Sequence, residues 1–260
     1  MKNLIKFSLF LILNGFLIFK IYSEDLTTFQ KIKTESKFTT CTAGGFPPFS
    51  VHGKDGWVGF DIDMIKSYAN FLKVKYEIID YHFDGIIPAL NTKKCDMIVS
   101  GMTITDERKK SVLFSNSYFK DGISVLMKKN NSSILNDFSF EKLNSENIKI
   151  GVRLGYTSDF YVGKNYKKAK ILKFNETADL INALKNNQID VIFTDTNNAV
   201  NISSKFGNSF IYKNTEIQNE YFGVAFRLKD KDLMENFNQF LISWVKTKEY
   251  SEIYEMHLVK

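Results

Sequence analysis

The segment 101–110, GMTITDERKK, concentrates groups that could hold an anion. Thr103 and Thr105 supply hydroxyl groups, and Arg108 supplies a planar guanidinium that can bind a carboxylate through two parallel hydrogen bonds. The segment follows an expected strand and opens a helical turn, whose backbone N–H groups also attract anions. This pattern predicts a carboxylate site, although an ordinary Thr-capped helix with a solvated basic end has the same composition.

A second signal is an internal repeat. Residues 87–98 read IPALNTKKCDMI and residues 181–192 read INALKNNQIDVI, a constant offset of 94. Each copy predicts the end of a helix, a polar turn and a strand. The same offset makes Gly101 and Asp195 equivalent, each near the carboxyl end of its strand. Because ligands of open α/β sheets collect at such ends, two similar lobes would place these residues on opposite walls of a cleft.

The elements that must position these residues alternate between short apolar strands and amphipathic helices. This alternation predicts an α/β fold with mainly parallel sheets. In the stretch 61–72 the apolar residues share one face of a helix, and we expect Asp61 to cap it rather than to pair with Asp63 as a catalytic acid. The expected strands are 38–43, 75–80, 96–100, 148–153 and 190–194.

The amino-terminal segment predicts export. Lysines flank the apolar run 7–19, FSLFLILNGFLIF, and as a helix this run would reach about 20 Å, short of the roughly 30 Å hydrocarbon layer. We therefore expect residues 1–23 to be a signal peptide cleaved after Ser23, rather than an uncleaved anchor. The sequence has no cysteine near that junction, which favours a free periplasmic form over a lipoprotein.

Composition excludes several classes of protein. With 260 residues, of which 44% are hydrophobic and 25% charged, the chain can bury a substantial core and is not expected to be disordered. The net charge of +6 would suit an acidic polymer, but part of the excess lies in the expected signal peptide. A lysine cluster with interleaved Tyr161 and Tyr166 is better explained as a solvated helix face, so we expect no nucleic-acid partner. Its members are Lys164, Lys167, Lys168 and Lys170.

Cysteine and histidine residues give no sign of a metal site. The histidines at 52, 82 and 257 lack the spacing of metal ligands, so we expect neither a metal nor another cofactor. Cys41 and Cys95 are the only cysteines, and an oxidising compartment would permit a disulfide. Two buried thiols on neighbouring strands remain the alternative, since the sequence cannot show whether the side chains meet.

Five motifs follow one another along the chain: FPPF at 46–49, VGFDID at 58–63, FDGIIPAL at 83–90, GMTITDERKK at 101–110 and FTDT at 193–196. In this order they resemble the extracellular solute-binding proteins of family 3, the polar amino-acid-binding proteins of bacterial ABC importers. This resemblance implies a periplasmic-binding-protein-like fold of type II, in which two α/β lobes with mainly parallel sheets and flanking helices are joined by two crossover strands.

The resemblance also implies a discontinuous first lobe. It would comprise residues 24–124 and 225–260, with residues 125–224 forming the second lobe and the crossings near 123–128 and 223–226. A monomer would enclose one amino acid between the lobes and deliver it to the membrane permease of an ABC importer.

Carried over to this sequence, the family's ligand contacts fall on both lobes. Arg108 would clamp the ligand α-carboxylate, assisted by Thr103 and by the backbone N–H groups of Thr103 and Thr157. Asp195 and the carbonyl of Gly101 would accept from the α-ammonium. Only a closed cleft satisfies both ends of such a zwitterion, which gives closure a driving force.

The side-chain compartment is where the sequence departs from familiar members. Phe46 and Phe83 match the family's aromatic walls, with ordinary core residues as the alternative. Arg153 keeps a basic position whose acidic companion is replaced by Ala43, which argues against a lysine or arginine ligand and favours glutamine or glutamate. A small polar amino acid or cystine stays open, as does an Arg153 that points to solvent.

The resemblance leaves two other functional classes. Some relatives of this fold are exported dehydratases, but such chemistry needs a general acid or base in the pocket. Asp195 is the only carboxylate among the matched positions and is assigned to the ammonium, so we do not expect an enzyme. A soluble amino-acid sensor is the third class.

Overall fold

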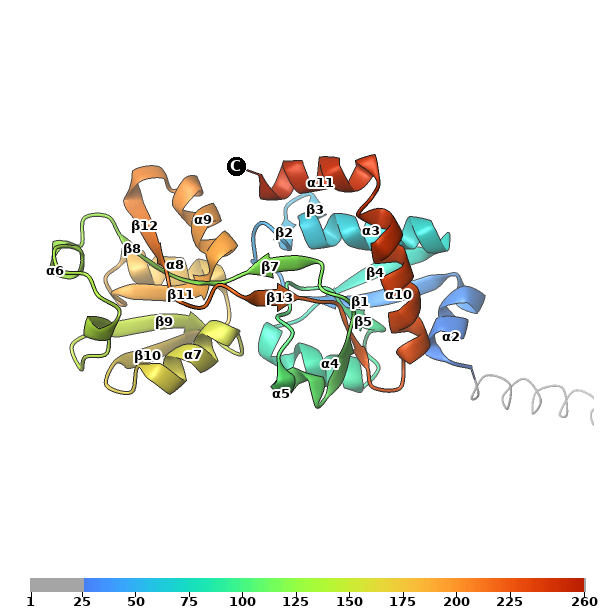
Figure 1. Ribbon diagram of the computed structural model, residues 1–260, viewed down its shortest axis with the longest axis horizontal. Helices are drawn as coiled ribbons and strands as arrows, with labels where there is room; N and C mark the ends of the chain where they lie inside the picture. Colours follow the sequence, from blue (N-terminus) through green and yellow to red (C-terminus); the bar gives the residue numbers. More distant parts are fainter. Residues whose placement is uncertain (1–25, 260) are drawn as a thin grey trace, which may run out of the picture.

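The computed structural model describes residues 26–259, which fold into two lobes (Figure 1). The segment 1–23, predicted to be a signal peptide, lies outside the described residues. Within the described part of the chain, no helix is long and apolar enough to cross a bilayer.

The first lobe is built on a five-stranded sheet of order β4-β1-β5-β14-β6. Strand β1 pairs in parallel with β4 and with the central strand β5, whereas β14 runs antiparallel to β5 and β6, so four of the five strands point the same way. The strands are β1 (Lys37–Thr42), β4 (Lys75–Asp80), β5 (Met97–Ile98), β6 (Val112–Phe114) and β14 (Ala225–Arg227).

The second lobe repeats this arrangement with the order β10-β9-β11-β8-β12. Here β9 pairs in parallel with β10 and β11, and β8 is the one reversed strand. Both sheets are thus mainly parallel, as the sequence predicts. The strands are β8 (Ile123–Lys128), β9 (Lys149–Arg153), β10 (Lys170–Phe174), β11 (Val191–Asp195) and β12 (Phe210–Asn214).

Helices flank both sheets (Figure 1). The first lobe carries α2 (Thr28–Glu35), α3 (Phe60–Leu72), α4 (Ile86–Asn91), α5 (Asp106–Lys109), α10 (Lys231–Trp244) and α11 (Lys248–Leu258), with a small hairpin of β2 (Val51–Gly53) and β3 (Gly56–Val58). The second lobe carries α6 (Ser132–Leu135), α7 (Thr157–Asn165), α8 (Thr177–Lys185) and α9 (Thr196–Lys205). Helical spacing explains the packing: α10 buries Leu233, Phe237, Phe240, Leu241 and Trp244 on one face.

The two lobes are connected by a two-stranded antiparallel sheet of β7 (Phe119–Asp121) and β13 (Glu220–Phe222), which lies between them in Figure 1. The crossings expected near 123–128 and 223–226 therefore lie a few residues earlier in the sequence, at β7 and β13. The apolar composition of 123–128 and 223–226 does predict strands, but β8 is buried inside the second sheet and β14 inside the first. The apolar composition of these two segments therefore indicates that they are buried in a sheet, and it does not indicate that they connect the lobes.

The prediction that Asp61 caps its helix is wrong. The helix α3 begins one residue earlier, at Phe60, and Gly59 occupies the capping position with a φ of 130°. A Cβ at Gly59 would lie 2.2 Å from the carbonyl oxygen of Phe49, so the close approach of these two segments requires glycine. Asp61 instead lies inside the first turn, fully buried.

The internal repeat corresponds to a repeated supersecondary unit. In each copy a helix, α4 or α8, leads through a short turn into the third strand of its sheet, β5 or β11. Lys93 and Asn187, which are 94 positions apart, both adopt a positive φ, 62° and 57°, in these turns. The backbone thus repeats even where the side chains differ.

Cys41 and Cys95 form a disulfide, with their Cα atoms 5.6 Å apart. Cys41 lies on β1 and Cys95 precedes β5, its neighbour in the sheet. The alternative of two free thiols is therefore wrong, and the bond fits a protein of an oxidising compartment.

The prediction that the lysine cluster forms a solvated helix face is wrong about the helix: only Lys164 lies on α7, Lys167 and Lys168 follow that helix, and Lys170 begins β10. All four lysines are exposed, whereas Tyr166 is buried with its ring centroid 4.9 Å from that of Phe193. Tyr166 is thus part of the core rather than an exposed platform for bases.

Candidate functional site

Arg108 lies buried where the two lobes meet. Its helix α5 is capped by Thr105, whose hydroxyl accepts a hydrogen bond from the Arg108 N–H at 3.2 Å. The guanidinium Nη1 donates to the carbonyl of Thr103 at 2.8 Å, and Nη2 donates to the carbonyl of Gly155, in the second lobe, at 3.1 Å. A single guanidinium thus bridges the lobes, with carbonyl partners that a ligand carboxylate could replace.

Asp195 lies opposite, at the end of β11 in the second lobe, and is 2% exposed. Its Oδ2 has no hydrogen-bond partner among the described residues. Burial raises the pKa of Asp195 well above its usual value, and the neighbouring carboxylates Glu220 and Asp121 raise it further, while Arg108 lowers it. An unpartnered buried carboxylate oxygen is a strong acceptor for a cation.

Glu220 and Asp121 were not predicted from the sequence. They face each other in the register of β13 and β7, and the Oε2 of Glu220 accepts a hydrogen bond from Thr157 Oγ1 at 3.0 Å. Burial raises the pKa of Glu220, and it raises that of Asp121 to about 6. Asp195 is the only carboxylate among the positions matched to the family, and the structure adds these two acids outside those positions. The sequence signal that could have identified Glu220 is its position directly before the aromatic pair Tyr221 and Phe222.

The loop after β5 is fixed by contacts with Phe46, Asp61 and Phe222. Gly101 has a φ of 53°, and a Cβ there would lie 2.3 Å from Cε1 of Phe46, so both conformation and space require glycine. Its N–H donates to Oδ2 of the buried Asp61 at 2.7 Å. Thr103 forms an isolated bridge with Phe222 of β13, which ties the loop to the strand pair between the lobes.

Phe46 and Phe83 lie on the first-lobe side of the interface and are both buried. Tyr156, from the second lobe, contacts both rings: its centroid lies 4.3 Å from that of Phe83 and 5.6 Å from that of Phe46. The guanidinium of Arg108 also lies 5.2 Å from the centroid of Phe83. The two aromatic walls are therefore part of the interface and not of a remote core.

Arg153 is 2% exposed, so the alternative in which it points to solvent is wrong. Its Nη1 donates to the hydroxyl of Tyr156 at 2.8 Å and to the carbonyl of Gly44 at 3.5 Å, and its Nη2 donates to the carbonyl of Asn175 at 2.8 Å. Within residues 26–259, no carboxylate forms an ion pair with Arg153. Its partners are neutral oxygen atoms.

The sequence profile of the bacterial extracellular solute-binding proteins, family 3, matches residues 38–260. The chain belongs to this family. It is 31% identical over 225 residues to the L-arginine-binding protein of Pseudomonas aeruginosa, covering 82% of this chain and 84% of the relative.

Two solved structures resemble this solute-binding protein along most of its length. One is an ancestral arginine-binding protein bound to glutamine, 36% identical, with a TM-score of 0.80 and coverage of 86% of this chain and 99% of that one. The other is an ancestral amino-acid-binding protein, a precursor of cyclohexadienyl dehydratase, 35% identical, with a TM-score of 0.81 and coverage of 89% and 99%. These relatives are named as binding proteins, in agreement with the prediction that the chain is not an enzyme.

The contacts of this solute-binding protein bring the residues predicted for the site into one connected region. Arg108 links Thr103, Phe83 and the second lobe, while Tyr156 links Phe83, Phe46 and Arg153. Gly101 abuts Phe46, Thr157 bonds to Glu220, and Asp195 interacts electrostatically with Arg108. The roles predicted for these residues toward a ligand stay predictions.

The rim of the interface carries an exposed contact between a histidine and a glutamate, which is an ion pair only when the histidine is protonated. His82 Nδ1 of the first lobe lies 3.1 Å from Glu176 Oε1 of the second. Both side chains are largely solvated, so the pair contributes little to holding the lobes together.

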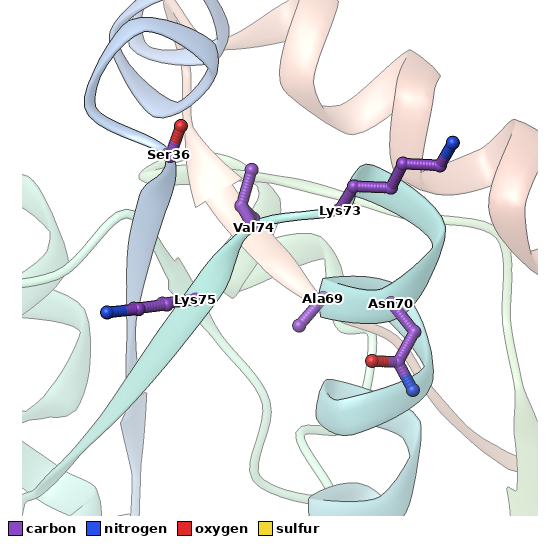
Figure 2. Close-up of a pocket in the computed structure, with 6 residues that line it drawn as sticks. All are labelled: Ser36, Ala69, Asn70, Lys73, Val74 and Lys75. Atoms are coloured by element: carbon purple, nitrogen blue, oxygen red, sulfur yellow. The ribbon is translucent and has the colours of Figure 1, made fainter.

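A separate pocket of about 430 Å³ lies on the first lobe, where α3 leads into β4 (Figure 2). In the figure Lys73 and Lys75 extend in different directions from it. The lining lacks an acid, so it offers nothing to pair with an ammonium group. It consists of Ser36, Ala69, Asn70, Lys73, Val74 and Lys75.

Proposed function

We propose that this solute-binding protein captures a polar amino acid between its lobes and delivers it to the permease of an ABC importer. The observation that carries the proposal is a buried cation on one lobe, Arg108, together with a buried acid on the other, Asp195, that has an unpartnered oxygen. Arg108 is a ready partner for an α-carboxylate and Asp195 for an α-ammonium, so a zwitterion complements both lobes at once.

The remaining contacts follow from the same pose. Thr103 lies beside Arg108, and Thr157, at the start of α7, lies beside Glu220. The hydroxyl and backbone N–H groups at these two positions would donate hydrogen bonds to the α-carboxylate of the ligand. The carbonyl of Gly101 would be a second acceptor for the ammonium. Phe46 and Phe83 would exclude water from the ligand side chain.

The side chain of the ligand is proposed to be an amide or a carboxylate, the class of glutamine and glutamate. Arg153 is a buried cation with neutral partners, so an oxygen atom of the ligand would complement it, whereas a second cation would be repelled at low dielectric. The related ancestral arginine-binding protein that was solved with glutamine supports such a ligand. The L-arginine-binding relative favours arginine as the ligand instead.

We further propose a monomeric periplasmic protein that requires no cofactor and has no nucleic-acid partner. Residues 1–23 would be its signal peptide, residues 24–124 with 225–260 its first lobe, and residues 125–224 its second. A soluble sensor that presents the same ligand to a receptor is the second candidate. It shares the binding step and differs only in the membrane partner.

A ligand panel tests the binding step. The chain from residue 24 is unfolded and refolded to remove carried-over ligand, and thermal shift and calorimetry are measured with each amino acid. We expect amides and acids to bind more tightly than lysine and arginine. Arg108→Ala should weaken every ligand at least about 30-fold, since truncating a buried charge pair costs about 2–5 kcal/mol.

Lys109→Ala is the matched control, because Lys109 is exposed on the same helix α5. It should leave every affinity unchanged. If no amino acid stabilises the refolded protein, the proposed function is wrong.

A further inference from the structure

The ring of Tyr156 contacts both predicted aromatic walls, Phe46 and Phe83. Tyr156 immediately precedes α7 in the second lobe, yet its side chain packs into the apolar core of the first lobe and is 3% exposed. Its ring is tilted by 41° against Phe83 and meets Phe46 edge-on at 69°. The compartment in which a ligand side chain would lie between these two walls therefore already contains a phenol ring.

The hydroxyl of Tyr156 also forms a hydrogen bond with the buried cation Arg153. The hydroxyl accepts from Nη1 of Arg153 at 2.8 Å, and Cζ of Arg153 lies 4.7 Å from the ring centroid of Tyr156. The Nε and Nη2 groups of Arg153 both donate to the carbonyl of Asn175. A ligand oxygen must therefore reach Arg153 alongside the tyrosine or in place of its hydroxyl.

We propose that Tyr156 determines the length of side chain that the protein accepts, and that it selects the short amide and acidic amino acids, asparagine and aspartate, over glutamine and glutamate. This inference rests on the proposed function, because it assumes that Arg108 and Asp195 fix the ligand's backbone. With those ends fixed, each added methylene drives the side chain further toward the ring of Tyr156. One methylene in a fitted pocket discriminates by about 10- to 200-fold.

The experiment compares two matched pairs of ligands, asparagine with glutamine and aspartate with glutamate. Each pair differs by one methylene and keeps the polar group. For wild type we expect the shorter member to bind at least about tenfold more tightly. Tyr156→Ala removes the ring, so the ratio should fall to about one or reverse.

Two further variants separate the ring from other effects. Tyr156→Phe keeps the ring and removes the hydroxyl, so the preference for the shorter member should persist. Tyr212→Ala removes an exposed tyrosine of β12 in the same lobe and should match wild type.

The outcomes distinguish this inference from the proposed function. A wild type that binds glutamine or glutamate more tightly than the shorter partner overturns the inference, whether or not Tyr156→Ala folds. An unchanged ratio in folded Tyr156→Ala also overturns it. A refolded wild type that binds no amino acid contradicts the proposed function itself.

Discussion

Four of the buried charged residues where the lobes join are Arg108, Asp121, Asp195 and Glu220. Arg108 interacts electrostatically with Asp195 and Glu220, Asp121 acts on both of these acids, and burial raises the pKa of all three. An ammonium placed among them would favour their ionised forms, because an opposite charge within a few ångströms stabilises the carboxylate. The residues thus suit a ligand that brings both a carboxylate and a cation, which is the case for any amino acid.

Asp61 is a buried acid that holds the backbone of Gly101 through a hydrogen bond. Its Oδ2 accepts from the N–H of Gly101 at 2.7 Å and its Oδ1 from the hydroxyl of Tyr118 at 2.9 Å. Burial raises its pKa from 3.8 to about 7, although both hydrogen bonds lower it. The folded protein therefore retains this proton at a pH where the unfolded chain has released it.

The sign of the resulting pH dependence follows from linkage. The stabilisation from Asp61 is fully present below about pH 3.8 and is lost as the pH rises through about 7. Relative to Asp61→Asn, the free energy of unfolding of wild type should fall over this range by at most roughly 4 kcal/mol, at about 1.36 kcal/mol per pKa unit. Urea unfolding at several pH values measures it.

The exposed acid Asp106 provides the control for Asp61. Asp106→Asn should leave the pH profile of stability parallel to that of wild type. A difference between wild type and Asp61→Asn that stays constant with pH would contradict the raised pKa.

At the scale of elements, the loop after β5 was predictable and its partner strand was not. The residue types of segment 101–110 indicate an anion site by themselves. Glu220 was missed because its approach to Thr157 and Asp121 depends on the register of β13 against β7, which the sequence does not display. Asp61 was misplaced for a similar reason: its type suits a helix cap, but the tight turn at Gly59 starts the helix earlier.

Gly101 tests how firmly this loop must be held. Alanine there would adopt a φ of 53° and place its Cβ 2.3 Å from Phe46. We expect Gly101→Ala to lower the free energy of unfolding by about 1–3 kcal/mol and to weaken ligand binding, because Phe46 must shift. Denaturant unfolding and calorimetry measure the two effects.

Gly163 offers a matched control in the second lobe. It lies inside α7, and a Cβ there would meet nothing within 4 Å. Gly163→Ala should raise the free energy of unfolding by about 0.5–1 kcal/mol through helix propensity and leave binding unchanged. Equal effects of the two substitutions would show that the left-handed turn at Gly101 is not required.

At the scale of the whole molecule, the two-lobed plan could be predicted while the contacts between the lobes could not. The repeat at offset 94 indicated two similar α/β units, and the two sheets share one strand arrangement. The contacts of Arg108 with Gly155 and of Arg153 with Gly44 depend on the relative orientation of the lobes. No periodicity or local motif encodes that orientation, and the exact lobe boundaries stay predictions.

The disulfide places a constraint on the first lobe alone. Cys41 and Cys95 are 54 residues apart in sequence and join adjacent strands of the first sheet. Closing a loop of this length restricts the unfolded chain by about 4 kcal/mol in the chain-entropy model. The double variant Cys41→Ala/Cys95→Ala should therefore unfold at a lower urea concentration, by up to that free energy.

Reductant separates the covalent bond from the packing of the two side chains, which are both buried. Wild type unfolded and refolded with a thiol reductant should approach the stability of the double variant, whereas the variant should not respond to reductant. Because the bond lies within one lobe, the loss should appear in the unfolding of the first lobe, which tryptophan fluorescence reports because Trp57 and Trp244 both belong to it. Equal unfolding of wild type with and without reductant would contradict a stabilising disulfide.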